Sequence, residues 1–360
     1  IINWKDRGES LKKILIVLLI GMSCFLITGC GKYDGKSFVK ELSKKVNNSD
    51  SYNLNGVLEI RNNEETYSYD VNVSYKKENN FKVSLKNKIN NYEQIILRNS
   101  EGIYVLTPSL NKSFKFQSEW PYNSSQAYLL MQINKDIQND SSKVVAEQNG
   151  DFIIKSAVNY PNNTSLKYQK TTLDKDGKLK KNEIYDEKDK LKMKVTITST
   201  DYKANLKESD FKLENYITET KEEDNKKETE NCSTDTCKEK KTGVIEEKLN
   251  PLYVPSNTFL SKSDKVSTDT GERYILTFAG DKNFVLVEEV ASIPSEFEII
   301  PVYGDPLVVS DTIGALGVNS LTWTKDNISY YLTSSDLTNN ELLTIGESIG
   351  YNNKSVSKEK

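Results

Sequence analysis

The chain has 360 residues, and its 49 basic and 52 acidic side chains leave a formal net charge of −3. A charge so balanced gives no overall field that favours nucleic acid as a partner. The sequence contains no histidine, which excludes Ser-His-Asp and Cys-His nucleophiles, histidine general bases and histidine metal ligands together. Paired carboxylates remain able to act on glycans, but the many acidic residues single out no pair. Catalysis is disfavoured, and no catalytic residue is assigned.

Residues 1–29 have the composition of a secretory signal peptide. Lys12 and Lys13 precede an uncharged, mostly aliphatic run over 14–27, which is short for a membrane span of roughly 20 residues. Positive charge, an apolar run and small residues in this order are typical of an exported protein. The less favoured alternative is an uncleaved membrane anchor. A start of translation at Leu11 would leave residues 1–10 untranslated.

The end of this segment resembles the bacterial lipobox at each of its four positions, Ile27, Thr28, Gly29 and Cys30. Small side chains at Thr28 and Gly29 admit the backbone to a peptidase cleft, and the Cys30 thiol takes up a diacylglyceryl group. We therefore expect a lipid-anchored protein at the extracytoplasmic face of the cell membrane. Its only prosthetic group would be the covalent lipid.

Two further cysteines, Cys232 and Cys237, lie close together in the mature chain. Outside the membrane they can form a small local disulfide or remain idle thiols. Two thiolates are an incomplete zinc site, and no histidine is present to complete it. A metal site is therefore the less favoured interpretation.

A charged, almost wholly polar segment over 219–242 predicts a solvated linker, because it has too little apolar surface to offset the entropy of ordering. It divides the mature chain into a first half over 30–218 and a second half over 243–350, followed by a disordered tail over 351–360. The linker would let the second half reach away from the first.

The first half predicts a long antiparallel sheet with few helices. Alternating apolar residues indicate strands with one buried face. The spacing of Phe38, Leu42 and Val46 predicts a helix before the strands, and a second helix over 125–137 interrupts them. The predicted strands cover residues 52–60, 67–75, 81–85, 95–97, 103–106, 114–116, 152–154, 166–172, 183–185 and 191–197.

A twisted sheet of this many strands tends to curl. The concave face then either forms a groove for lipid or peptide, or is plugged by side chains of the helices, such as Leu130 and Ile133. The pattern alone favours the plugged core. Phe114, Phe116 and Trp120 are either a partner-facing aromatic loop or, as we favour, a strand end packed beneath the following helix.

The second half predicts a smaller α+β unit. Hairpins are expected over 274–289 and 321–332. The last helix is marked by a capping box, Thr338 with Glu341, by a contact of Leu337 with Leu342, and by Gly350 at its end. Ile313-Gly314-Ala315 together with Trp323 is interpreted as core packing.

Several segments carry a more specific signal. They are Gln94–Asn99, Glu101–Pro108, Asn111–Ser118, Trp120-Pro121 and Asn123–Gln126, and, in the second half, Thr277–Gly280, Thr312–Leu316, Leu321–Thr324 and Asp336–Thr338. They resemble the sporulation lipoproteins of endospore-forming Firmicutes, known as YdcC-like or outer membrane lipoprotein carrier (LolA-like) proteins. The second half is similar to a small domain of unknown function in Firmicute membrane-associated proteins.

The resemblance implies an α+β fold: an N-terminal curved antiparallel half-barrel of eleven strands with covering helices, plus the smaller C-terminal α+β domain. It also implies a concave apolar surface, which raises the groove to equal weight with the plugged core. Gram-negative carriers receive lipoprotein acyl chains there. The related clostridial germination lipoprotein GerS instead binds and activates a cortex-processing amidase. The carriers' pocket arginine is not assignable to Arg61 or Arg98, so no binding residue is carried over.

Three functions follow as expectations. The first is a non-enzymatic lipoprotein of a spore-forming Gram-positive bacterium that binds an envelope protein during sporulation or germination. The second is a carrier or sensor of acyl chains in the concave groove. The third and least favoured is a carboxylate-dependent enzyme acting on peptidoglycan.

Overall fold

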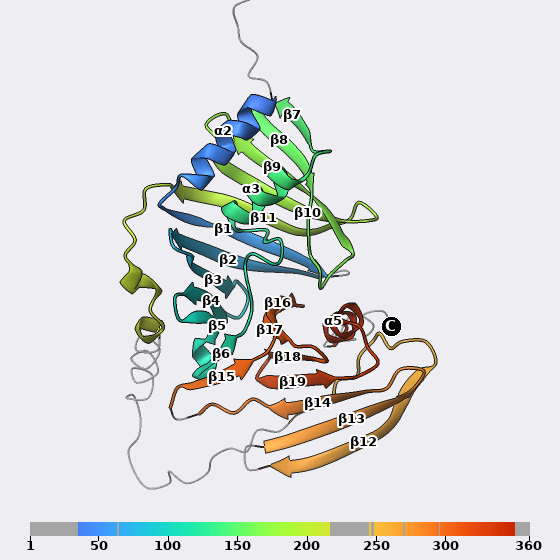
Figure 1. The fold of residues 1–360 in the computed structure, drawn as a ribbon. Coiled ribbons are helices and arrows are strands. Elements are labelled where there is room, and N and C mark those ends of the chain that lie inside the picture. The colour runs from blue at the N-terminus through green and yellow to red at the C-terminus, as the bar shows by residue number, and fades with distance from the viewer. Residues whose placement is uncertain are drawn as a thin grey trace, which may run out of the picture.

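The computed structural model describes residues 35–62, 65–216, 245, 248–268, 271–294 and 296–349. Two large β-sheets lie one above the other, with helices against their inner faces (Figure 1). The predicted lipobox, the pair Cys232 and Cys237, the linker over 219–242 and the tail over 351–360 lie outside these residues.

The first sheet has twelve strands in the order β15-β6-β5-β4-β3-β2-β1-β11-β10-β9-β8-β7. Its eleven strands from the first half are all antiparallel, and their alternating buried residues confirm the predicted curved half-barrel. They are β1 (Ser51–Asn62), β2 (Glu65–Lys76), β3 (Asn80–Asn87), β4 (Glu93–Asn99), β5 (Gly102–Thr107), β6 (Lys112–Phe116), β7 (Val144–Gln148), β8 (Asp151–Ala157), β9 (Leu166–Asp174), β10 (Leu179–Asp186) and β11 (Leu191–Asp201). Short 3₁₀ turns η1 (Pro108–Leu110) and η2 (Glu208–Phe211) complete this half.

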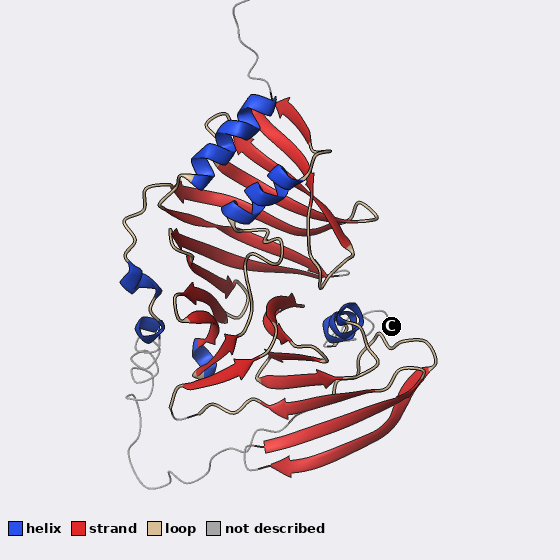
Figure 2. Ribbon diagram, viewed as in Figure 1, coloured by secondary structure: helices blue, strands red, loops and turns tan. Residues whose placement is uncertain are grey.

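Two helices, α2 (Gly35–Asn47) and α3 (Leu130–Asn139), lie across the upper part of this sheet (Figure 2). Phe38 on α2 stacks on Phe152 of β8 with ring centroids 3.8 Å apart, and Ile133 of α3 is buried in the same core. The expected helix over 125–137 begins later than predicted, because Leu129 has an extended backbone with ψ of 110°. Helix side chains therefore plug one end of the concave face.

The second sheet has seven antiparallel strands in the order β12-β13-β14-β19-β18-β17-β16. Helix α5 (Asn339–Glu347) packs on its inner face, with Leu342 and Ile345 fully buried. The predicted capping box is confirmed, since Thr338 accepts from the Glu341 N–H while the Glu341 carboxylate accepts from the Thr338 N–H. The strands are β12 (Thr258–Thr268), β13 (Gly271–Gly280), β14 (Phe284–Val290), β16 (Asp305–Val309), β17 (Thr312–Leu316), β18 (Ser320–Lys325) and β19 (Ile328–Thr333).

One strand of the second half belongs to the first sheet, which differs from the expectation of a second half free to reach away. Strand β15 (Glu298–Val302) adds to β6 in parallel, with Ile300 opposite Phe114. Ile313 and Ala315 of β17 are buried in the core of the first half rather than their own. The half-barrel thus gains its twelfth strand and part of its core from the second half.

Candidate functional site

A cleft of about 320 Å³ lies where the open end of the half-barrel meets the second half. Its walls come from the ends of β1 and β11, from the loops before α3 and after β8, and from β16, β17 and α5. The lining residues are Ile60–Asn62, Ile96, Trp120, Asn123, Ser124, Gln126–Tyr128, Tyr160, Asn162–Leu166, Lys192, Met193, Asp305–Val308, Ile313, Asn340, Leu343, Thr344 and Glu347. An occupant of this cleft would touch both halves of the chain.

The floor beside the cleft is fixed by Gln94 of β4. Its side-chain oxygen accepts from the N–H of Ile313 at 2.6 Å and from the hydroxyl of Thr312 at 3.0 Å. Its amide nitrogen donates to the Ile313 carbonyl at 3.1 Å. All of these groups are buried, where an unpaired polar group is costly, so the pairing sets the register of β17 on the first sheet.

A carboxylate from the second half fastens the loop before α3. Asp305 at the start of β16 accepts from the Ser118 hydroxyl, from the Asn123 amide at 2.8 Å and from the Asn162 amide at 3.5 Å. These three donors all come from the first half. Because its oxygens are engaged in this way, Asp305 serves to hold the two halves together.

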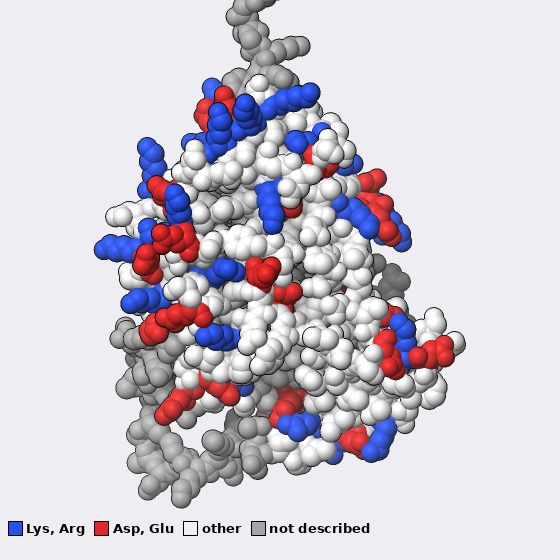
Figure 3. All heavy atoms as spheres, viewed as in Figure 1, with Lys and Arg blue, Asp and Glu red and all other residues white. Residues whose placement is uncertain are grey.

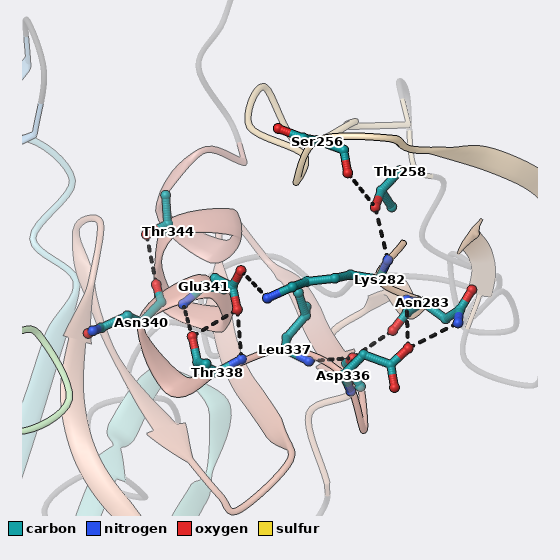
Figure 4. Close-up of polar contacts among 11 residues, drawn as sticks. Ser256, Thr258, Lys282, Asn283, Asp336, Leu337, Thr338, Asn340, Glu341 and Thr344 are labelled. Carbon is teal, nitrogen blue, oxygen red and sulfur yellow. Dashed lines mark hydrogen bonds and ion pairs between the residues drawn. The ribbon is translucent and has the colours of Figure 1, made fainter. Parts of the chain in front are cut away.

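Helix α5 forms the wall opposite β1. Asn340 exchanges two hydrogen bonds with Thr164, and the Asn62 amide donates to the carbonyl of Glu347 at 3.3 Å. The start of α5 is itself held by the network in Figure 4, in which Glu341 binds Thr338 and Lys282. The cleft wall is therefore a rigid helix supported from both ends.

Glu347 is a carboxylic acid of the cleft lining with a raised pKa. Burial raises the pKa of its carboxyl to about 7, although Lys192 lowers it. Glu347 and Asp305 are the two carboxylates lining the cleft. A carboxyl whose pKa lies near neutrality is typical of functional sites, which adds to the interest of this cleft.

Apolar groups lie beside these polar ones. Ile60, Ile96, Met193, Leu307 and Leu343 line the cleft together with the amides of Gln126 and Asn163. An apolar surface with a few convergent polar groups is typical of a binding site. The sequence did not identify this site, because its walls come from segments far apart in the chain and several of its residues lie in loops.

The two arginines considered for a carrier pocket are placed differently. Arg61 lines the cleft, whereas the Arg98 guanidinium donates to the Trp120 carbonyl and lies 5.0 Å from the Tyr122 ring centroid. Trp120 is 1% exposed and meets Phe81 edge-on. This confirms that the aromatic segment packs inward instead of facing a partner.

The described ranges contain no group of three or more His, Cys, Asp or Glu side chains that could hold a metal ion. Within the same residues, every helix is too short or too polar to cross a membrane.

Comparison with known proteins gives a relative that covers most of the chain. The chain is 33% identical over 343 residues to Sporulation protein YdcC of Bacillus subtilis (strain 168), covering 95% of this chain and 98% of that protein. No family model matches the sequence.

Solved structures are similar at a distance. MucB has a TM-score of 0.32 at 14% identity over 89% of this chain and 98% of its own. A putative outer membrane lipoprotein-sorting protein domain from Vibrio parahaemolyticus has a TM-score of 0.33 at 13% sequence identity. The match covers 51% of this chain and 98% of that domain. A chain from the structure of the CwlD amidase from Clostridioides difficile in complex with the GerS lipoprotein has a TM-score of 0.26 at 14% sequence identity. The match covers 48% of this chain and 94% of that one.

Proposed function

We propose that this chain, which belongs to the YdcC family of sporulation proteins, is a membrane-anchored, non-enzymatic lipoprotein that binds another envelope protein during spore formation or germination. The relative named for sporulation covers both halves and the region between them. The family relationship thus includes both halves of the chain.

The anchor is proposed on Cys30, after the lipobox residues Ile27, Thr28 and Gly29. A Cys30→Ser variant should lose incorporation of radiolabelled fatty acid and leave the membrane fraction of sporulating cells. Retention of both would contradict the anchor. The proposed Cys232–Cys237 disulfide is tested separately, by the mass change on reduction and alkylation.

Binding, in preference to catalysis, is supported by what the cleft offers. The sequence has no histidine, and the oxygens of Asp305 are engaged by three donors of the first half. That leaves Glu347 without a second free carboxylate among the lining residues, whereas glycan hydrolysis commonly uses two.

The observation that carries the protein-binding role is the outer edge of the second sheet. Strand β12 pairs with β13 on one side, and among the described residues it has no strand on the other. None of its eleven residues is buried, and Phe259 is 63% and Val266 is 42% exposed. A long, exposed edge strand offers backbone groups to an extended segment of a partner.

A pair of exposed substitutions tests this role without disturbing the fold. Phe259→Asp/Val266→Asp on β12 should reproduce the spore phenotype of a gene deletion. Ile89→Asp/Val318→Asp, at residues each 81% exposed elsewhere, should behave as wild type. Normal spores from the β12 variant or from the deletion would contradict the proposal.

The apolar lining of the cleft favours a second candidate, a carrier or sensor of acyl chains. Native mass spectrometry of the unlipidated chain should then show a bound lipid, and substitution of Met193 by Asp in the cleft wall should remove it. A clean unliganded mass after gentle extraction would contradict this candidate.

A further inference from the structure

A basic face lies at the end of the molecule where the described chain begins. Lys36, Lys40 and Lys44 follow one another at intervals of four residues along α2, all exposed, and Lys143 joins them from the start of β7. The four lysines line a groove of about 660 Å³ between α2 and the segment from the end of α3 to β7. In Figure 3 basic side chains gather over α2.

Two carboxylates lie on the segments that carry these lysines, Glu41 on α2 and Asp140 before β7. Lys143 donates to the backbone carbonyl of Asp140 at 2.8 Å, and the Asp140 carboxylate is occupied by the Ser142 hydroxyl and the Ala157 N–H. Glu41 is the acidic residue of α2. Like charges spaced four residues apart destabilise an isolated helix, so the stripe gains stability from an external anion.

The position of this face relative to the chain identifies the anion. Only residues 31–34 separate Cys30 from Gly35, where α2 begins. Even a fully extended chain of that length spans roughly 18 Å. A lipid on Cys30 would therefore hold α2 close to the membrane surface, within reach of phospholipid headgroups.

We propose that the basic face, defined by Lys36, Lys40, Lys44 and Lys143, lies against anionic phospholipid headgroups and orients the anchored protein. Val144, 60% exposed beside Lys143, would meet the same interface. This orientation directs β12 away from the membrane, because α2 and β12 lie at opposite ends of the molecule (Figure 1). The proposal rests on the proposed anchor at Cys30 and adds a second, electrostatic contact.

The test uses the mature chain with Cys30→Ser, so that no lipid contributes to binding. Sedimentation with vesicles of phosphatidylcholine containing phosphatidylglycerol is compared with vesicles of phosphatidylcholine alone. Binding should require phosphatidylglycerol and weaken with added salt, as screening predicts.

Lys40→Glu/Lys44→Glu should lower the partition coefficient by about tenfold or more, given the attraction of each basic residue to an anionic surface. Lys188→Glu/Lys190→Glu, an equal charge change in the exposed turn between β10 and β11, should change it by less than about twofold. Equal losses from the two variants, or equal binding to both vesicle types, would overturn the proposal. Failure of the Cys30 anchor appears separately, as absent lipid labelling of the wild-type chain in cells.

Discussion

The side chain of Gln94 makes two hydrogen bonds to the backbone of Ile313, which lies 219 positions further along the sequence. The side-chain amide of Gln94 acts on β17 as a neighbouring strand would, accepting from its N–H and donating to its carbonyl. This pairing joins the core of the half-barrel to the second half and fixes the floor beside the cleft.

Replacing Gln94 by Met tests the strength of this connection. Met preserves the shape of the side chain but leaves the buried N–H and carbonyl of Ile313 unpaired, at a cost of about 1–3 kcal/mol for each group. We expect the free energy of unfolding in urea to fall by about 2–6 kcal/mol. The matched variant Gln148→Met, at an exposed position, should change it by less than about 0.5 kcal/mol. Similar values for the two would contradict the assignment.

The dependence of one half on the other gives a second prediction. Produced alone, residues 30–218 would expose the edge of β6 and the apolar side chains that pack against Ile313. We expect this fragment to unfold at lower urea concentration than the whole chain and to self-associate through the open edge.

Mixing it with residues 243–360 should give a one-to-one complex in size-exclusion chromatography and restore the unfolding midpoint. Two fragments that each fold fully and form no complex would show that the halves are independent domains.

Much of the half-barrel could be predicted from the sequence because its strands are formed by local alternation. Tyr52, Leu54 and Leu58 share a face in the sequence and in the core alike. The position of strand β15 in the first sheet could not be predicted, because its parallel pairing with β6 links segments far apart in the chain. Strand β12 escaped prediction because it is exposed on both faces and shows no alternation.

The site was harder to predict than the fold. The segment Gln94–Asn99 carries part of the family resemblance, but nothing local shows that Gln94 binds the backbone of Ile313. Glu347 falls within the predicted last helix, where its spacing marks it as an ordinary polar residue. The residues of β1 and β11 that line the cleft with it belong to the other half.

Glu347 predicts a pH dependence of stability. Its folded pKa of about 7 lies above the ordinary value of 4.5, so the folded chain binds the proton more tightly than the unfolded chain. The contribution to stability is complete below about pH 4.5 and is lost as the pH rises through 7. The free energy of unfolding should therefore fall between pH 5 and pH 8.

Glu347→Gln should reduce that fall, by about 1 kcal/mol because the side chain is partly exposed. Burial also raises the pKa of Glu288 to about 7 and that of Asp136 to about 6, so adding Glu288→Gln should reduce the slope further and Asp136 should account for part of what remains. Urea titrations at both pH values measure each step. An unchanged slope in the Glu347 variant would show that its carboxyl is solvated.

The helix that forms the cleft wall can be weakened at its start. Thr338→Ala removes the hydroxyl that accepts from the Glu341 N–H, and should lower the free energy of unfolding by about 1 kcal/mol. Thr338→Ser keeps the hydroxyl and should retain most of that stability. Equal losses from Ala and Ser would mean that the methyl group of Thr338, and not the cap, stabilises α5.

Anchored recognition of an envelope protein through the edge of β12 is tested most directly by site-specific photo-crosslinking. A crosslinking amino acid at Val266 is compared with one at Ile89, which is exposed away from that edge, in the lipidated chain of sporulating cells. A single protein adduct at position 266, absent at position 89 and lost with Phe259→Asp, is the predicted result. Adducts that do not differ between the two positions, or none at position 266, would contradict it.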